Sequence, residues 1–156
     1  MQKITPFLWF NTNAEEAINF YTSIFKDSKM GNVVRYGDTG PGPKGTVMTA
    51  TFQLFGQDFV TLNGGPQFKF NESISFVVNC ETQDEVDYYW EKLSEGGSKS
   101  QCGWLKDKFG LSWQIVPTEL PQLFMGEPAK SQNAMKAMMK MNKLDINVLK
   151  QAYAEG

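Results

Sequence analysis

Few side chains of this 156-residue chain could carry out acid–base or nucleophilic chemistry, because the sequence contains no histidine. This absence excludes Ser-His-Asp and Cys-His catalysis, and it excludes any zinc or iron site with histidine ligands. A general base near neutral pH would have to be a carboxylate, lysine, tyrosine or cysteine thiolate whose pKa is shifted.

The two cysteines, Cys80 and Cys102, do not have the CxxC spacing of redox or metal sites. We expect both to be reduced and, from the usual burial of cysteine, to be small semi-buried hydrophobic residues. Cys102 is close in sequence to Trp104 and Lys106, so it is also a candidate pocket thiol. A nucleophilic role would need a lowered pKa, for which the sequence offers no helix terminus or adjacent cation.

Composition indicates a globular protein that does not bind nucleic acid or membranes. Hydrophobic residues make up 41% of the chain, and the net charge is −2, so no general positive field attracts polyanions. No apolar run approaches the roughly 18–20 residues that span a bilayer. The N-terminal segment has no signal-peptide apolar region, so we expect a cytoplasmic location.

The glycine-rich segments do not predict a nucleotide or S-adenosylmethionine site. They lie at 40–45 and at 64–65, neither leads into a predicted helix, and neither contains the GK[ST] of a phosphate loop. We therefore expect no cofactor, and nothing in the sequence supports methyl transfer.

These side chains must be positioned by elements that repeat along the chain. Ala17, Phe20, Tyr21 and Ile24 form an apolar helical face, and Val86, Tyr89, Trp90 and Leu93 repeat it 69 residues later. Asn13 and Thr82 precede the two helices as N-caps.

After each helix the hydrophobic pattern changes to that of strands. We expect strands at 7–10, 33–36, 46–55 and 58–62, and in the second half at 76–79, 99–104 and 111–116. The fold class is therefore α+β, with two βαβββ half-repeats at 1–63 and 71–117 in a single domain. A C-terminal extension at 118–156 contains predicted helices at 120–125, 131–142 and 145–153.

Several separated segments resemble one known family. They are the run from Pro6 to Tyr21, Asn63 to Pro66, Cys102 to Gln114, and the tail from Met141 to Ile146 with Ala152 and Tyr153. They resemble PhnB-like proteins, also called 3-demethylubiquinone-9 3-methyltransferase-like, of the vicinal oxygen chelate superfamily (glyoxalase, bleomycin-resistance and dioxygenase relatives). The resemblance implies curved mixed sheets around a cleft with helices outside, and it does not fix a function.

In metal-using relatives, the resemblance implies ligands near the start of the first strand and on the last strand of each unit. The 69-residue offset places these positions at Pro6, Val60, Ser75 and Gln114. Proline and valine have no donor atom for a metal, serine is a poor neutral ligand, and only the Gln114 amide oxygen could coordinate. We therefore expect no catalytic metal.

Alternation along the strands predicts two faces for each sheet. The face expected to pack on the helices has bulky side chains: Phe7, Trp9, Phe59, Phe76, Val78, Trp113 and Ile115. The other face has smaller side chains with some polar groups, which suits a small-molecule cleft. Together with Cys102, the predicted ligand-binding residues are Leu8, Val60, Leu62, Ser75, Val77, Ser112 and Gln114. The alternative is that this face is a second, thin core.

Three functions remain open at this point. The first is a metal-free protein that binds a small aromatic or amphipathic molecule. The second is an enzyme of lyase, isomerase or dioxygenase type with atypical catalytic groups, and the third is a structural or regulatory dimer without a ligand.

We expect a homodimer, because unpaired sheet edges invite pairing and isologous contacts are usual in soluble homo-oligomers. The methionine-rich tail offers an adaptable apolar surface for it. The residues expected to contact the other subunit are Met135, Met138, Met139 and nearby Leu144 or Ile146. Alternatively, the tail folds over its own cleft as a lid and leaves a monomer.

Overall fold

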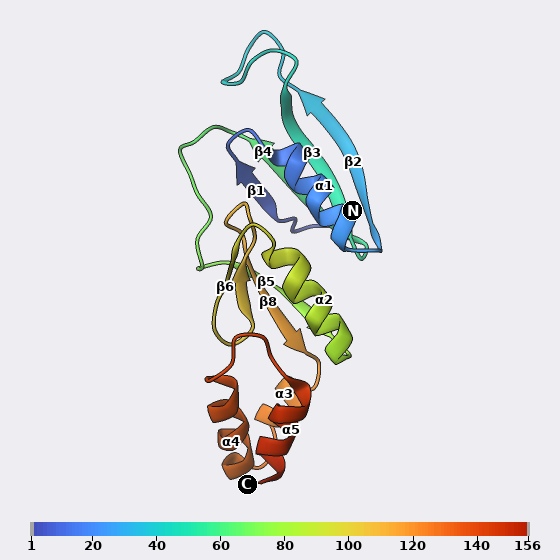
Figure 1. The fold of residues 1–156 in the computed structure, drawn as a ribbon. Helices are drawn as coiled ribbons and strands as arrows, with labels where there is room; N and C mark the ends of the chain where they lie inside the picture. Colours follow the sequence, from blue (N-terminus) through green and yellow to red (C-terminus); the bar gives the residue numbers. More distant parts are fainter. Residues whose placement is uncertain (1, 156) are drawn as a thin grey trace. The chain divides into compact units, whose positions relative to one another are not determined.

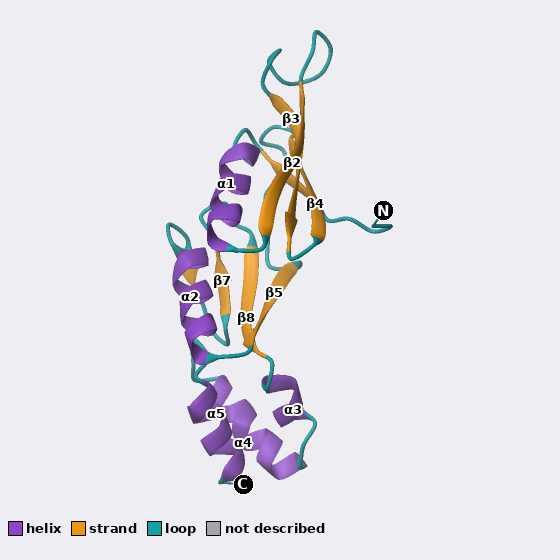
Figure 2. Cartoon of the chain, turned by 90° about the vertical axis from the view of Figure 1, so that its right-hand side faces the viewer, coloured by secondary structure: helices purple, strands orange, loops and turns teal. Residues whose placement is uncertain are grey.

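The computed structural model describes residues 2–155, which form two compact units that divide after Phe70. Each unit has a four-stranded sheet with one long helix packed on one face (Figures 1 and 2). The first unit contains β1 (Phe7–Phe10), α1 (Ala14–Ile24), β2 (Ser28–Arg35), β3 (Val47–Leu54) and β4 (Gln57–Asn63). The second unit contains β5 (Ser75–Cys80), α2 (Gln83–Ser94), β6 (Ser98–Lys99), β7 (Trp104–Lys106) and β8 (Ser112–Pro117).

Both sheets have the same mixed topology, which confirms the predicted βαβββ repeat. The strand orders are β1-β4-β3-β2 and β5-β8-β7-β6. In each unit the first and last strands pair in parallel, and the remaining pairs are antiparallel. The chain closes each unit by returning its last strand to the side of its first.

Two strand predictions differ from the structure. The strand expected at 99–104 is divided into β6 and β7 by a turn in which Cys102 and Gly103 have positive φ angles of 59° and 83°. Such angles interrupt an extended chain. In the first unit, β2 begins at Ser28 rather than at residue 33, and only residues 25–27 separate it from α1.

The connection between the first strand and the helix is one residue longer in the first unit. Residues 11–13 separate β1 from α1, whereas residues 81–82 separate β5 from α2. The helices therefore follow a 69-residue offset, but the first strands, β1 and β5, follow one of 70 residues. Phe7 pairs with Val60 in the first unit as Val77 pairs with Gln114 in the second.

The predicted faces of β1 are wrong for this reason, because a shift of one residue reverses the face of every side chain in a strand. Leu8 is buried (6% exposed) and Phe7 is 58% exposed, the opposite of the expectation. Leu8 pairs with the buried Thr61, which places it on the helix side of the sheet.

The predicted faces of the second sheet are confirmed. Val78, Trp113 and Ile115 are buried on the helix side. Their strand neighbours Val77 and Gln114 alternate to the other side and are partly exposed.

Stacked aromatic rings fill the space between α1 and its sheet. Tyr21 of α1 stacks on Phe52 at 5.9 Å between ring centroids, and Phe52 stacks on Phe59 at 4.9 Å. The buried Thr61 hydroxyl donates to the carbonyl oxygen of Ala50 at 2.9 Å, so this polar group is satisfied inside the core.

In the second unit, a buried carboxylate fixes the turn between β7 and β8. Asp107 Oδ1 accepts hydrogen bonds from the amides of Phe109 (2.9 Å) and Leu111 (3.0 Å). Its Oδ2 accepts from Nε1 of Trp113 at 2.9 Å. These donors compensate for removing the carboxylate from water and hold the indole in the core.

The tail packs on its own second unit. It contains α3 (Leu120–Phe124), α4 (Pro128–Met138) and α5 (Ile146–Ala154). Leu120, Leu144 and Leu149 form a buried cluster, against which Met138 and Met141 pack. The Gln83 side chain joins α2 to this region, since it donates to Leu144 O (3.0 Å) and accepts from Ile146 N (2.8 Å).

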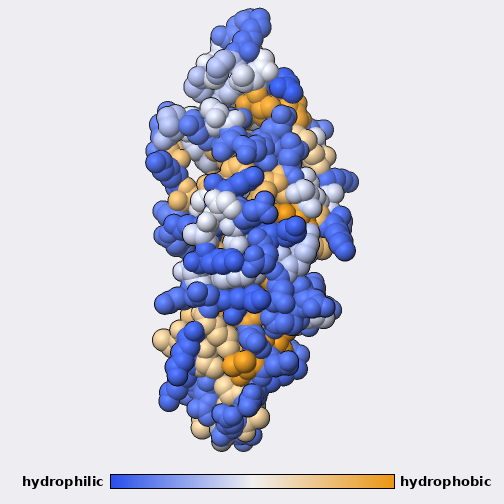
Figure 3. Space-filling model, in the orientation of Figure 1, coloured by the Kyte–Doolittle hydropathy of each residue, from blue (hydrophilic) through white to orange (hydrophobic). Residues whose placement is uncertain are grey.

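This packing corrects part of the expected subunit interface. Leu144 and Ile146 are buried within their own chain, so they cannot be the exposed contacts predicted for a partner. Met139 is 62% exposed and stays available. Figure 3 shows hydrophobic surface over part of these helices, in the lower part of the view. Within residues 2–155, no helix is long and apolar enough to cross a bilayer.

The face assignment predicts different costs for truncating two tryptophans. Trp113→Ala should lower the free energy of unfolding by about 3–5 kcal/mol, because it removes a large aromatic side chain from the core. Trp9→Ala should cost distinctly less, because Trp9 is only half-buried, with its ring against Phe68. Urea denaturation of the two variants measures both values, and equal losses would contradict the reversed faces of β1.

Candidate functional site

The face of the second sheet that α2 does not cover, here called the open face, carries most of the predicted polar site residues. Strand register fixes its members: Ser75, Val77, Trp104, Lys106, Ser112 and Gln114. Ser112 lies between Ser75 and Lys106 on the neighbouring strands, and Gln114 lies between Val77 and Trp104. The parallel pairing of β5 and β8 thus brings Ser75, Val77, Ser112 and Gln114 together as predicted.

A cavity of about 590 Å³ lies at this region, within the usual size range of small-molecule pockets. It is lined by Glu72, residues 98–102 and 104–106, and Ser112. Two of the predicted ligand-binding residues, Cys102 and Ser112, therefore line the same cavity. The sequence did not identify Lys99 or Trp104 as part of it, because β6 and β7 were expected to be one strand, and it did not identify Glu72, which precedes β5.

Ser112 is the most unusual side chain of this cavity. It is 0% exposed, and its hydroxyl has no hydrogen-bond partner among the described residues. On its neighbour β5, the Ser75 hydroxyl accepts a hydrogen bond from Nε2 of Gln114 at 2.9 Å. A buried hydroxyl without a partner costs about 1–3 kcal/mol, so a bound polar group could recover part of this free energy.

Charged side chains stand at the rim of the cavity. Lys106 forms an ion pair with Glu72, and Lys99 forms one with Glu91 of α2 at 2.9 Å. The hydrogen bond from Lys106 lowers the pKa of the Glu72 carboxyl, so Glu72 is ionised at neutral pH. On the open face the rim therefore presents one ammonium group, that of Lys106, which is engaged with the Glu72 carboxylate, whereas the Lys99 ammonium is engaged with Glu91.

The predicted residues of the first unit are only partly brought together. Val60 and Leu62 lie on the face of the first sheet that α1 does not cover, beside Phe7 and Trp9. Leu8 lies on the opposite face, toward α1. Val60 lines a separate cavity of about 440 Å³. Leu8 is therefore removed from the candidate site.

The strand offset also changes the positions that metal ligands would occupy. Ser75 corresponds to Thr5 rather than to Pro6 under the 70-residue offset of the first strands. The set then becomes Thr5, Val60, Ser75 and Gln114, in which Val60 has no donor atom and the two hydroxyls are poor neutral ligands. The described residues contain no cluster of three or more histidine, cysteine or acidic side chains suited to a metal. These residues do not fit a catalytic divalent ion.

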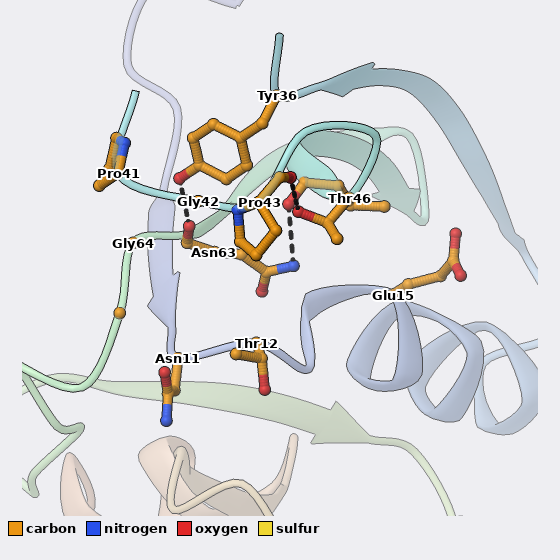
Figure 4. A pocket seen from close by; sticks show the side chains of 12 residues that line it. Asn11, Thr12, Glu15, Tyr36, Pro41, Gly42, Pro43, Thr46, Asn63 and Gly64 are labelled. Carbon is orange, nitrogen blue, oxygen red and sulfur yellow. Dashed lines mark hydrogen bonds between the residues drawn. The ribbon is translucent and has the colours of Figure 1, made fainter. Parts of the chain in front are cut away.

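A third cavity, of about 380 Å³, lies between the glycine- and proline-rich loop at residues 37–45 and the start of α1 (Figure 4). The Tyr36 hydroxyl donates to Asn63 O at 2.5 Å, and Gly42 lies so close to the tyrosine ring that a Cβ would collide with it. The Asn63 side chain accepts from Ala14 N (2.9 Å) and donates to Val47 O (3.1 Å). Asn63 thus caps α1, a role that the sequence had assigned to Asn13.

Two central polar groups of this third cavity serve its own construction. The hydroxyl of Tyr36 and the amide of Asn63 are both engaged by backbone groups. The glycine- and proline-rich loop after Tyr36 was the sequence signal for this cavity. The loop alone did not indicate which part of the chain it would cover. The second-unit cavity, with an unpartnered hydroxyl, is the better candidate for ligand binding.

Comparison with known proteins agrees with this geometry. A family model described as 3-demethylubiquinone-9 3-methyltransferase matches residues 2–116. The chain belongs to this PhnB-like family. A putative 3-demethylubiquinone-9 3-methyltransferase, PhnB protein, from Bacillus cereus is 42% identical, and the match covers 75% of this chain and 100% of that one, with a TM-score of 0.69.

More distant structures share the fold alone. A protein from Pseudomonas aeruginosa is 21% identical with a TM-score of 0.62, and covers 75% of this chain and 98% of its own. The fosfomycin resistance protein FosX from Listeria monocytogenes is 14% identical with a TM-score of 0.57, over 81% of this chain and 98% of its own. A search of curated proteins gave no match. The predicted glyoxalase/bleomycin resistance-like fold and family are thus confirmed.

The two cysteines should differ in reactivity. Burial, and secondly the charge of Glu85, raises the pKa of the Cys80 thiol to about 12, so almost none of it is thiolate at pH 8. Cys102 is half-buried and lines the cavity. Iodoacetamide at pH 8 should therefore alkylate Cys102 in the native protein and reach Cys80 only after denaturation, as read by peptide mass mapping. Equal native labelling of both would contradict the burial of Cys80.

Proposed function

We propose that this PhnB-like protein binds a small organic molecule on the open face of its second sheet and uses no catalytic metal there. The observation that carries the proposal is the buried, unpartnered hydroxyl of Ser112 at a cavity of about 590 Å³. Trp104 adds a large aromatic surface to the same wall. A polar group that lacks a partner inside a ligand-sized cavity is what a binding site needs in order to orient its occupant.

Methyl transfer, which the family description names, has no support in the local structure. S-adenosylmethionine sites commonly use a glycine-rich turn between a strand and a helix. Here the two strand–helix connections are Asn-Thr-Asn at 11–13 and Glu-Thr at 81–82, without glycine. The glycine-rich segment at 40–45 leads into β3 instead.

Binding is also favoured over catalysis by atypical groups. Glu72 is the carboxylate that lines the cavity, and its pKa is lowered through the hydrogen bond from Lys106. A carboxylate with a lowered pKa is a weak base near neutral pH, whereas an effective general base needs a pKa close to that pH. The cavity is thus better suited to holding a molecule than to removing its proton.

The proposal predicts an organic ligand and no stoichiometric metal. Native mass spectrometry of protein purified without added ligand should show a bound organic molecule, and elemental analysis should show no stoichiometric zinc, iron, nickel or manganese. Loss of a bound divalent ion on Gln114→Ala would contradict the metal-free site. A protein with neither an organic molecule nor a metal would favour the third function, a structural dimer.

The cytoplasmic location of the protein remains a prediction. We also propose that the protein is a homodimer. β2 is an edge strand of its sheet and is exposed from Lys29 to Arg35, and an unpaired edge invites pairing. Met139 is the most exposed of the methionines expected to contact a partner.

Sedimentation velocity at micromolar concentration tests this assembly. The wild-type chain should sediment as a dimer, and Met139→Lys should sediment as a monomer, because it places a charge in an apolar contact. Met125→Lys is the matched control, since Met125 is also exposed and lies outside the predicted contact set. A wild-type monomer would contradict the dimer, and a dimer that survives Met139→Lys would contradict the role of Met139.

A further inference from the structure

We infer that the occupant of the second-unit cavity is an organic anion with a flat apolar body, of the class of aromatic carboxylates. The inference rests on the proposed function and adds the chemistry of the ligand. It follows from two neighbouring cross-strand pairs, Lys106 opposite Ser112 and Trp104 opposite Gln114.

Two of the open-face side chains at the cavity, Lys106 and Ser112, can offer hydrogen-bond donors to a ligand. Lys106 contributes an ammonium group and the unpartnered Ser112 hydroxyl can donate, whereas the Lys99 ammonium is held by Glu91 of α2. The amide nitrogen of Gln114 is already directed to Ser75, so it does not compete for this hydroxyl. A ligand that accepts hydrogen bonds and carries negative charge matches this set better than a cation does.

The carboxylate at the rim does not block an anion. Lys106 and Glu72 are 39% and 61% exposed, and ion pairs between exposed side chains contribute little to stability. Both side chains are long and flexible, so Lys106 can exchange Glu72 for a ligand carboxylate. A charge-assisted bond from Lys106 together with the Ser112 hydroxyl would then hold the two oxygens of that group.

The flat apolar body is inferred from Trp104. Its indole is half-buried on the open face, next along the sheet from Lys106. Aromatic rings bind flat partners by offset stacking or edge contacts. Because Trp104 and Lys106 are two residues apart on one strand, they point to the same face and can engage the ring and the acid group of one molecule.

Three probes with the same naphthalene ring and different charge test this inference: 2-naphthoate, 2-naphthamide and 2-naphthylmethylamine. Isothermal titration calorimetry of the full chain should show 2-naphthoate binding at least tenfold more tightly than the amide, and no detectable binding of the amine. Lys106→Met should weaken 2-naphthoate binding at least tenfold and leave the amide unchanged. Lys108→Met is the matched control and should change neither, because Lys108 does not line the cavity and lies over the Phe109 ring.

Ser112→Ala separates binding from folding. Because the hydroxyl has no partner in the structure, its removal should leave the urea midpoint unchanged or raised, whereas 2-naphthoate binding should weaken several-fold. A lowered midpoint with unchanged binding would overturn the role of Ser112.

Equal binding of 2-naphthoate and 2-naphthamide would overturn the inference and leave the proposed function standing. Tighter binding of the amine, or no binding of any probe, would also overturn it. The proposed function is decided independently by the mass-spectrometric search for a bound organic molecule.

Discussion

The parallel pairing of the first and last strand in each unit is the constraint on which both sheets depend. It places Val77 beside Gln114 and Phe7 beside Val60, so it decides which side chains share a face. Because the helix covers one face of each sheet, the side chains on the other face are the ones that can meet a ligand. The hydroxyl and amide groups of β5 and β8 reach one another only through this pairing, since 39 residues separate Ser75 from Gln114.

The helical tail supports the candidate site from outside the region that the family model matches. The amides of Cys102 and Gly103 donate to the carbonyl oxygens of Met141 (2.9 Å) and Asn142 (2.8 Å). The carbonyl oxygen of Gly103 in turn accepts from the amide of Ile115 in β8 at 2.8 Å. These bonds hold the positive-φ turn that separates β6 from β7, and this turn forms one wall of the cavity. The tail therefore has a structural task within its own chain, whatever its exposed methionines contact.

The fold could be predicted from the sequence because its signals are local and repeated. The helical faces at Ala17 and Val86 and the predicted N-caps Asn13 and Thr82 mark the two copies without any knowledge of contacts. The faces of β1 could not be predicted in the same way, because they depend on one extra residue between strand and helix. Helix periodicity cannot detect that residue, which becomes visible only in the strand register.

The candidate site was predictable only in part, for a similar reason. Alternation along β5 and β8 placed Ser75, Ser112 and Gln114 on one face, as the strand register has them, because both strands are regular. Trp104 and Glu72 were missed, since one follows an irregular turn and the other precedes β5. Whether a hydroxyl has a partner is a property of the packed structure, and no pattern in the sequence distinguishes Ser112 from the satisfied Ser75.

The same topology has diverged in chemistry between the two copies, and this divergence explains why one of them is the candidate binding unit. Val60 of the first unit corresponds to Gln114 of the second, so the first open face has an apolar residue where the second has an amide. Other polar side chains of the first sheet bind one another, as Gln53 binds Asp58 at 2.6 Å. In the second unit, Gln114 donates a hydrogen bond to the Ser75 hydroxyl, and the neighbouring Ser112 hydroxyl has no partner among the described residues. A folded chain gains no stability from burying a hydroxyl without a partner, so the place of Ser112 beside a cavity supports the binding proposed for this unit.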